Sequence, residues 1–207
     1  MKLFELKDVC FRYPKGPWIL KNINLEIEEG ERVGLVGPSG YGKSTLAQIM
    51  AGYLKPISGS VLWKGEPLPQ KGYAPMQLIW QHPERAVNPR WRMKRILSEG
   101  WMPEEDFLEK IGIEQEWMDR WPIELSGGEL QRFCIARALA PQTQFLIADE
   151  MTTMLDVITQ AQIWEFLLKE TAERNIGLLA VTHNLSLASR ICTRVIDLSR
   201  IQDGSAS

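Results

Sequence analysis

The sequence lacks the features that would mark a membrane-spanning, disulfide-bonded or strongly basic protein. Among its 207 residues, no run approaches the ~18–20 consecutive apolar residues that a membrane helix needs. Only three cysteines and two histidines are present, and they lie far apart, so neither a disulfide framework nor a zinc site is indicated. The net charge of −2 indicates no overall affinity for nucleic acid, although a local basic patch stays open. These scarcities favour a soluble globular protein with reduced, buried thiols that reaches a membrane only through a partner.

Apolar runs alternate with segments of helical periodicity along most of the chain. Buried strands are predicted at 32–37, 76–81, 144–150, 176–183 and 193–199, and helices at 43–54, 127–140 and 157–175. Buried strands that alternate with helices predict a parallel sheet covered on both faces.

The first third of the chain and its middle depart from this alternation. Strand patterns at 3–13, 22–31 and 60–68 predict a second, antiparallel sheet, and the Glu-Gly turn that ends 22–31 predicts a hairpin there. From His82 the sequence becomes Pro-rich and basic, and short helical stretches follow. We therefore predict one α/β domain. Its core comprises residues 1–81 and 141–207 and includes an antiparallel β-subdomain, and residues 82–140 form an inserted α-helical subdomain.

The glycine loop "GPSGYGKST" predicts a phosphate site. Gly37, Gly42, Lys43 and Ser44 have P-loop spacing, between a predicted strand and a predicted helix. Glycines let successive N–H groups point inward, the helix N-terminus adds partial positive charge, and Lys43 can reach the β- and γ-phosphates. An ordinary glycine turn is the weaker alternative in this context. The predicted ATP-binding residues of this loop are Gly37, Pro38, Ser39, Gly40, Tyr41, Gly42, Lys43, Ser44 and Thr45.

Polar side chains end three of the predicted buried strands. Asp149 and Glu150 end "FLIADE", Gln81 ends "MQLIWQ" and His183 ends "LLAVTH". In α/β folds, ligands bind at the carboxyl ends of strands, so these four side chains are expected around one site. Each alone is more often a polar cap or a solvated strand end. We predict Glu150, His183 and Gln81 as catalytic residues, and Ser44, Gln81 and Asp149 as Mg²⁺ ligands.

A second glycine turn, "LSGGELQR" at 125–132, is the most specific motif. Together with the P-loop, Gln81, "FLIADE", "MLD" and "VTH", it resembles the ATP-binding-cassette (ABC) ATPases over nearly the whole chain. The resemblance implies a P-loop NTPase core that pairs head to tail with a second cassette, so that each signature turn closes over the other's nucleotide. The residues that carry this role are Leu125, Ser126, Gly127, Gly128 and Glu129. Ser126 as a plain helix N-cap is an alternative, and the two roles can coexist.

The resemblance assigns two further positions and shows one departure. Tyr13 matches the aromatic residue that stacks on adenine, and Asp156 matches the aspartate that communicates across the dimer. The family's usual Pro-Thr-Ser-Ala is replaced here by residues 151–154, Met-Thr-Thr-Met, so the geometry of that loop is open. Tyr41 is bulky for a P-loop and is expected to point outward.

Segments such as "QHPERAVNPR" resemble the peptide/nickel importer branch, nearest its nickel-type second ATPase. The resemblance implies an ATP- and Mg²⁺-dependent ATPase for uptake of nickel, a metal–metallophore complex or small peptides. It implies a peripheral position on the cytoplasmic side of the inner or plasma membrane. The implied partners are a transmembrane permease, a related or identical ATPase and, indirectly, an extracellular substrate-binding protein, with no nucleic acid. Residues 82–91, with an exposed Trp91, are expected to receive the permease's coupling helix.

Two other classes remain as alternatives. A soluble, non-transport ABC ATPase acting on nucleic acid or ribosomes usually has two cassettes or a long coiled-coil insertion, and this sequence shows neither. A nucleotide kinase would share the P-loop but would leave residues 126–128 and Glu150 unexplained.

Overall fold

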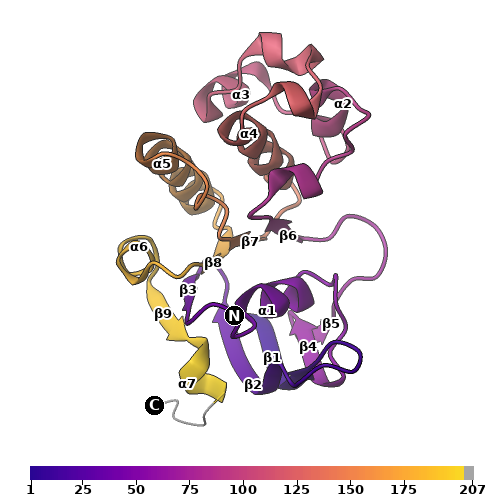
Figure 1. Ribbon diagram of the computed structural model, residues 1–207, viewed down its shortest axis with the longest axis vertical. Coiled ribbons are helices and arrows are strands. Elements are labelled where there is room, and N and C mark those ends of the chain that lie inside the picture. The colour runs from indigo at the N-terminus through magenta and orange to yellow at the C-terminus, as the bar shows by residue number, and fades with distance from the viewer. Residues whose placement is uncertain (203–207) are drawn as a thin grey trace.

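The computed structural model describes residues 1–202, and its centre is a five-stranded parallel sheet (Figure 1). The strand order is β6-β7-β8-β3-β9. These strands are β3 (Arg32–Val36), β6 (Met76–Ile79), β7 (Phe145–Asp149), β8 (Gly177–Val181) and β9 (Arg194–Asp197). Every residue of β7 and β8 is buried, which explains their unbroken apolar sequences.

An antiparallel sheet of order β2-β1-β4-β5 packs against one face of the parallel sheet. Its strands are β1 (Lys2–Phe11), β2 (Leu20–Glu28), β4 (Ser58–Trp63) and β5 (Glu66–Pro67). Phe4 and Trp63 from this sheet meet Phe145 of β7, and Phe4 lies edge-to-face to both rings with centroids 4.9 Å apart. This contact fixes β7 against the antiparallel sheet, and β7 carries the two acids of the candidate site.

The hairpin predicted after 22–31 is wrong. Beyond Gly30, whose φ is +70°, the chain enters β3, which pairs in parallel with β8 and β9 and not with β2. The reason is burial: four of the five residues of β3 are buried, and this pattern fits a central strand with both faces covered. The antiparallel partner of β2 is β1.

Helices complete the two other parts of the molecule. α1 (Lys43–Met50), α5 (Val157–Glu173), α6 (Leu185–Ile191) and α7 (Leu198–Gln202) accompany the parallel sheet. Between β6 and β7 the chain forms α2 (Met93–Leu97), α3 (Glu105–Ile111) and α4 (Gly127–Ala138), with 3₁₀ turns at 83–85, 115–119 and 122–124. These three helices gather at the end of the molecule opposite the antiparallel sheet (Figure 1). The predicted fold class is confirmed.

Several element ends differ from the sequence pattern. The strand predicted at 193–199 ends at Asp197, because the Asp197 carboxylate accepts hydrogen bonds from the backbone N–H and hydroxyl of Ser199 and begins α7. The predicted helix at 43–54 ends at Met50. Helix α6 was not predicted, and Asn184 caps its N-terminus.

All three cysteines are free, but only Cys134 is buried. Within residues 1–202, no helix is both long and apolar enough to cross a membrane.

Candidate functional site

The P-loop joins β3 to α1, and the Lys43 side chain folds back over it. Gly42 precedes α1 with a φ of +94°, and a Cβ there would lie 2.7 Å from the Ile19 Cγ2 atom, so only glycine fits. The Lys43 side chain, 5% exposed, donates from Nζ to the carbonyl oxygens of Gly37 (2.9 Å) and Pro38 (3.1 Å). Its positive charge therefore lies over the loop. Tyr41 points outward and is 44% exposed, as expected.

Ser44 and Asp149 bring two oxygen ligands together beside the P-loop. The Ser44 hydroxyl donates to Asp149 Oδ1 at 3.0 Å. Burial raises the pKa of the Asp149 carboxyl to about 6; the charge of Glu150 adds to this, and the Ser44 hydrogen bond and the charge of Lys43 oppose it. A hydroxyl and a carboxylate are hard oxygen ligands of the kind that Mg²⁺ prefers, so these residues fit that ion. A bound Mg²⁺ supplies neutralising charge for a triphosphate.

The raised pKa of Asp149 predicts a pH-dependent loss of stability. An unfolded aspartate has a pKa near 3.9, so the folded chain holds an extra proton between about pH 4 and pH 6. The resulting stabilisation is complete below about pH 4 and is lost as the pH rises through about 6. In EDTA, Asp149→Asn should therefore raise the free energy of unfolding at pH 7.5 by up to about 3 kcal/mol, and by much less at pH 4.5. Urea unfolding at both pH values measures this difference, and an equal gain at both would contradict the assignment.

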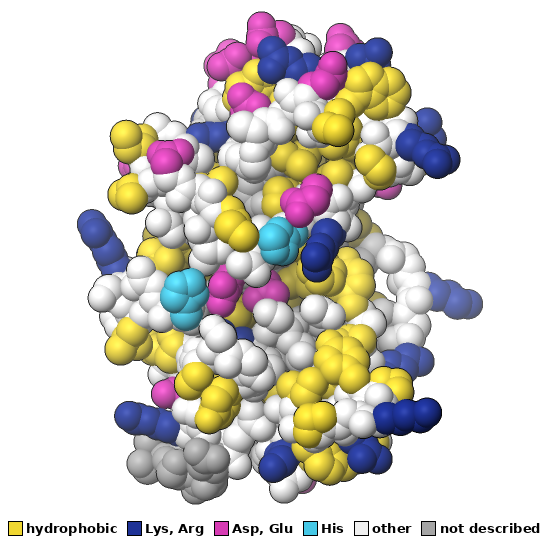
Figure 2. Space-filling model, in the orientation of Figure 1, with side chains coloured by type: hydrophobic (Ala, Val, Ile, Leu, Met, Phe, Trp, Pro, Cys, Tyr) yellow, Lys and Arg dark blue, Asp and Glu magenta, His cyan; other side chains and the backbone are white. Residues whose placement is uncertain are grey.

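Glu150 lies at the point where three strand ends meet. Its Oε2 atom is 3.5 Å from Gln81 Nε2, after β6, and 3.4 Å from His183 Nδ1, after β8. Figure 2 shows acidic and histidine side chains gathered across the middle of this face. Glu150 has a φ of +46°, and its N–H is held by the Val181 carbonyl at 3.0 Å. Such left-handed backbone is uncommon outside glycine and persists where surrounding contacts hold it.

The Met-Thr-Thr-Met loop after Glu150 is held by its two threonines. The Thr152 hydroxyl accepts hydrogen bonds from Gln160 Nε2 and Trp164 Nε1 of α5. The Thr153 hydroxyl donates to the Glu150 carbonyl at 2.9 Å and accepts from Gln81 Nε2 at 3.2 Å. Thr153 is thus a site residue that the sequence did not reveal, because the loop departs from the family pattern where the threonine stands.

The signature turn forms the N-terminus of α4. Ser126 Oγ accepts from the Glu129 N–H, and Glu129 Oε2 accepts from the Ser126 N–H at 2.7 Å, so the predicted N-cap role is confirmed. Gly128 faces Thr159 and Leu155 near the start of α5. Across residues 1–202, no hydrogen bond joins residues 125–129 to the P-loop. A 340 Å³ hollow, lined by both Leu125 and Gln81, separates the signature turn from the residues after β6 and β7.

Two predicted residues lie outside this cluster. Asp156 caps α5, where Oδ1 accepts from the N–H groups of Ile158 and Thr159 and Oδ2 accepts from the Thr159 hydroxyl. That side-chain hydrogen bond is the main reason that the pKa of Asp156 is lowered. Tyr13 follows β1 and is 43% exposed, with its ring edge-to-face on Phe11. The end of the same loop, Ile19, touches Gly42 of the P-loop.

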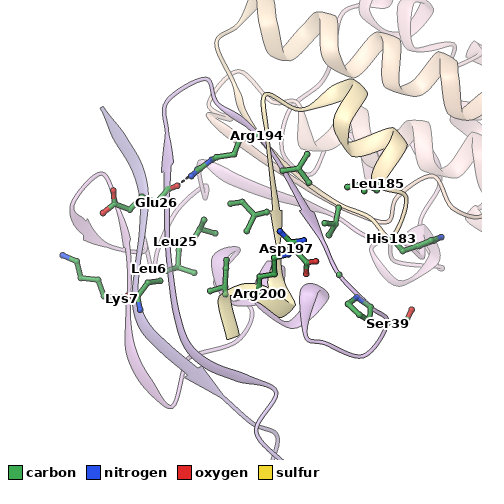
Figure 3. A pocket seen from close by; sticks show the side chains of 17 residues that line it. Leu6, Lys7, Leu25, Glu26, Ser39, His183, Leu185, Arg194, Asp197 and Arg200 are labelled. Atoms are coloured by element: carbon green, nitrogen blue, oxygen red, sulfur yellow. Dashed lines mark hydrogen bonds between the residues drawn. The ribbon is translucent and has the colours of Figure 1, made fainter. Parts of the chain in front are cut away.

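A groove of about 1220 Å³ opens beside the P-loop, between the two sheets (Figure 3). Strands β1, β2 and β9 and helix α7 line it, and it reaches Ser39 at one end. Arg194 bridges it by donating to the Glu26 carbonyl at 2.6 Å. Its lining mixes acidic, basic and apolar side chains with the first P-loop residues, Gly37, Pro38 and Ser39.

The fold and the site define a P-loop NTPase: a glycine loop between a parallel strand and a helix, with a buried acid at the end of β7, two strands away in the same sheet. The ABC transporter family model matches residues 20–153, more than half of the chain. The chain therefore belongs to the ABC transporter family.

Curated relatives and solved structures agree with this assignment. The nickel import ATP-binding protein NikE of Escherichia coli (strain K12) is 36% identical, over 95% of this chain and 83% of the relative. NikE of Shigella dysenteriae serotype 1 (strain Sd197) is 34% identical with the same coverage. A dimeric ATP-binding cassette, MJ0796, in a post-hydrolysis state with ADP and Pi, has a TM-score of 0.81, 30% identity and 94% coverage of both chains. The structure of cbiO1 from Clostridium perfringens, part of the transporter complex cbiONQ, has a TM-score of 0.78, 26% identity and coverage of 95% and 84%. The chain is an ABC ATPase.

Proposed function

We propose that this chain hydrolyses Mg-ATP at the strand-end cluster described above and couples that hydrolysis to import across a membrane. The observation that carries the proposal is the meeting of Glu150, Gln81 and His183 at the edge where Lys43, Ser44 and Asp149 also lie. Phosphoryl transfer needs charge stabilisation and an aligned attacking group, and this edge offers both. The proposed division places residues 82–140 as a helical subdomain and the rest as the nucleotide-binding core.

Each side chain in the cluster has a distinct proposed task. Lys43 and the P-loop amides hold the β- and γ-phosphates, and Ser44, Asp149 and Gln81 hold Mg²⁺. Glu150 orients a water molecule and accepts its proton as the oxygen bonds to the γ-phosphorus and the bond to the ADP oxygen breaks. His183, 3.4 Å from Glu150, donates a hydrogen bond to the γ-phosphate. Tyr13 stacks on adenine.

The signature turn serves a second nucleotide in this proposal. Helix α4 is 12 residues long, and residues 126–128 stand at its N-terminus, where backbone N–H groups favour an anion. Because the signature turn has no bond to its own P-loop, it is free to close over the γ-phosphate bound by a partner cassette. Asp156 then lies at the contact between the two cassettes. The related cassette MJ0796 was solved as a dimer, which supports this arrangement.

Nickel, a metal–metallophore complex or a small peptide is the proposed cargo of the assembled importer. The NikE relatives, which carry nickel import in their name, support the first of these. They also support import over the soluble alternative that acts on nucleic acid or ribosomes. The proposed site of action is the cytoplasmic side of the inner or plasma membrane, with a permease, a second ATPase and, indirectly, an extracellular substrate-binding protein.

The proposed permease contact is a hollow of 270 Å³ between the turn after α1, β6 and α4, and its lining includes Tyr53, Trp80, Arg85 and Arg137. Tyr53 is 61% exposed at its rim and lies edge-to-face on Trp80. The expectation of an exposed Trp91 is wrong: its ring is partly buried, and the Arg95 guanidinium lies 3.9 Å from the ring centroid. Trp91 does not line the hollow, and Tyr53 is the exposed aromatic side chain there.

Capture from detergent-solubilised native membranes tests this function. The tagged chain should co-purify with a permease, and Tyr53→Ala should reduce the captured permease by about tenfold, because a central aromatic anchor carries much of an interface's energy. Met102→Ala, which truncates an exposed side chain outside the hollow, is the matched control and should capture as much as the native chain. Ribosomes or DNA in place of a permease would support the soluble alternative.

A further inference from the structure

The segment that follows β6 is attached to one face of α4 by three side chains in register. Gln131 donates from Nε2 to the Trp80 carbonyl at 3.3 Å, Cys134 Sγ lies 3.8 Å from the Pro83 carbonyl, and Arg137 donates to the Ala86 carbonyl at 2.6 Å. Donors three residues apart on the helix thus meet acceptors three residues apart on residues 80–86. Because residues three apart on a helix share a face, α4 and this segment are held as one unit.

Among these three side chains, Gln131 is the one whose polar group is hardest to explain by packing alone. It is 1% exposed, and its Oε1 atom has no hydrogen-bond partner among the described residues. The Trp80 carbonyl can only accept, so Nε2 must face it and Oε1 must point away from it. A buried acceptor without a partner costs stability, and methionine or leucine would fill the same space without that cost. The benefit of a glutamine here therefore lies in its donor.

The carbonyl that Gln131 holds belongs to the peptide bond leading into Gln81. Because a peptide unit is planar, fixing the Trp80 carbonyl also fixes the direction in which Gln81 leaves the strand. The Gln81 side-chain amide reaches Thr153 Oγ1 at 3.2 Å and Glu150 Oε2 at 3.5 Å. Gln131 also lies on α4, the helix that Ser126 caps, so one side chain connects the signature helix to the residues around Glu150.

We propose that Gln131 is a positioning residue that sets the Gln81 amide against Glu150 and makes this setting depend on the position of α4. The inference rests on the proposed role of Gln81 and adds a residue that touches neither nucleotide nor Mg²⁺. Displacement of α4 carries the Trp80 carbonyl with it and withdraws Gln81 from the site. Closure of the signature turn and readiness for hydrolysis are then linked through the row of contacts to α4, of which the Gln131–Trp80 hydrogen bond lies next to Gln81.

Gln131→Met tests the proposal, because methionine keeps the length of the side chain and removes the donor. We expect the kcat for ATP to fall by about tenfold while its KM stays within about twofold. The melting temperature should be unchanged or higher, because the unpaired acceptor is gone. Amide hydrogen exchange across residues 80–86 should rise without nucleotide. Gln162→Met is the matched control: its amide oxygen accepts from Arg132 on another side of α4, and none of the four readouts should change.

A double-mutant cycle separates this inference from the proposed site. If Gln131 acts through Gln81, Gln131→Met will lower kcat no further in a Gln81→Ala background. Additive losses would overturn the inference, as would a native kcat for Gln131→Met beside a slow Gln81→Ala. A native kcat for Gln81→Ala would remove the proposed role of Gln81 itself, and the inference with it. Should Gln131→Met fail to fold, Gln131→Leu takes its place in the same cycle.

Discussion

Glu150→Gln should lower the rate of ATP hydrolysis by at least about a hundredfold while ATP binding is retained, because it removes only the proposed base of the reaction. The amide has the same shape as the carboxylate, so the left-handed backbone at this position and its bond to the Val181 carbonyl are kept. It cannot accept a proton from water, and it changes the contact with His183. Steady-state phosphate release and equilibrium binding of a fluorescent ATP analogue measure the two quantities separately.

The control for this variant is Glu165→Gln, which neutralises an exposed glutamate on α5 away from the site. It should hydrolyse ATP at the native rate. Robust hydrolysis by Glu150→Gln would remove Glu150 from its role and leave the attacking water without a base. Loss of ATP binding together with hydrolysis would show that the carboxylate contributes to holding the nucleotide.

Lys43→Ala should weaken ATP binding by at least about tenfold, because it removes the full positive charge that lies over the P-loop. The helix N-terminus and loop amides remain and supply only a partial charge. Lys55→Ala, at an exposed lysine beyond α1, changes the net charge equally and should bind ATP as the native chain does. Titration with ATP measures the dissociation constant of each variant.

Unfolding measurements keep this result interpretable. Lys43 is buried and also bonds the Gly37 and Pro38 carbonyls, so its loss can disturb the loop itself. Lys43→Arg keeps the charge with a different geometry and should bind more tightly than Lys43→Ala. Unchanged affinity in a folded Lys43→Ala protein would contradict the phosphate site.

The meeting of strand-end residues was predictable because it follows from topology alone. Once β6, β7 and β8 are parallel neighbours, the residues that end them must come together, and Gln81, Glu150 and His183 do. The P-loop was equally predictable from the sequence, because it is defined by residue types at fixed spacing. In both cases a short stretch of sequence is enough to predict where the residues lie.

Other features depend on contacts within the chain between residues far apart in sequence, and no local motif predicts these contacts. The sequence around Gly30 is typical of a hairpin turn, but β3 is buried and pairs with β8 in the parallel sheet. The role of Thr153 depends on the loop folding back on the Glu150 carbonyl, and that of Gln131 on a backbone carbonyl, which every residue type has. The stacking of Arg95 on Trp91 likewise turned a predicted exposed tryptophan into a partly buried one.

The account depends most on a nucleotide site completed by the signature turn of a second cassette. Its most direct test is the solution mass of Glu150→Gln, with and without saturating Mg-ATP, beside its permease and any ATPase that co-purifies with it. We predict that ATP converts the 23.7 kDa chain to a species with two cassettes, and that Ser126→Arg prevents this conversion. A chain that binds ATP and still remains a single cassette under these conditions would contradict the account.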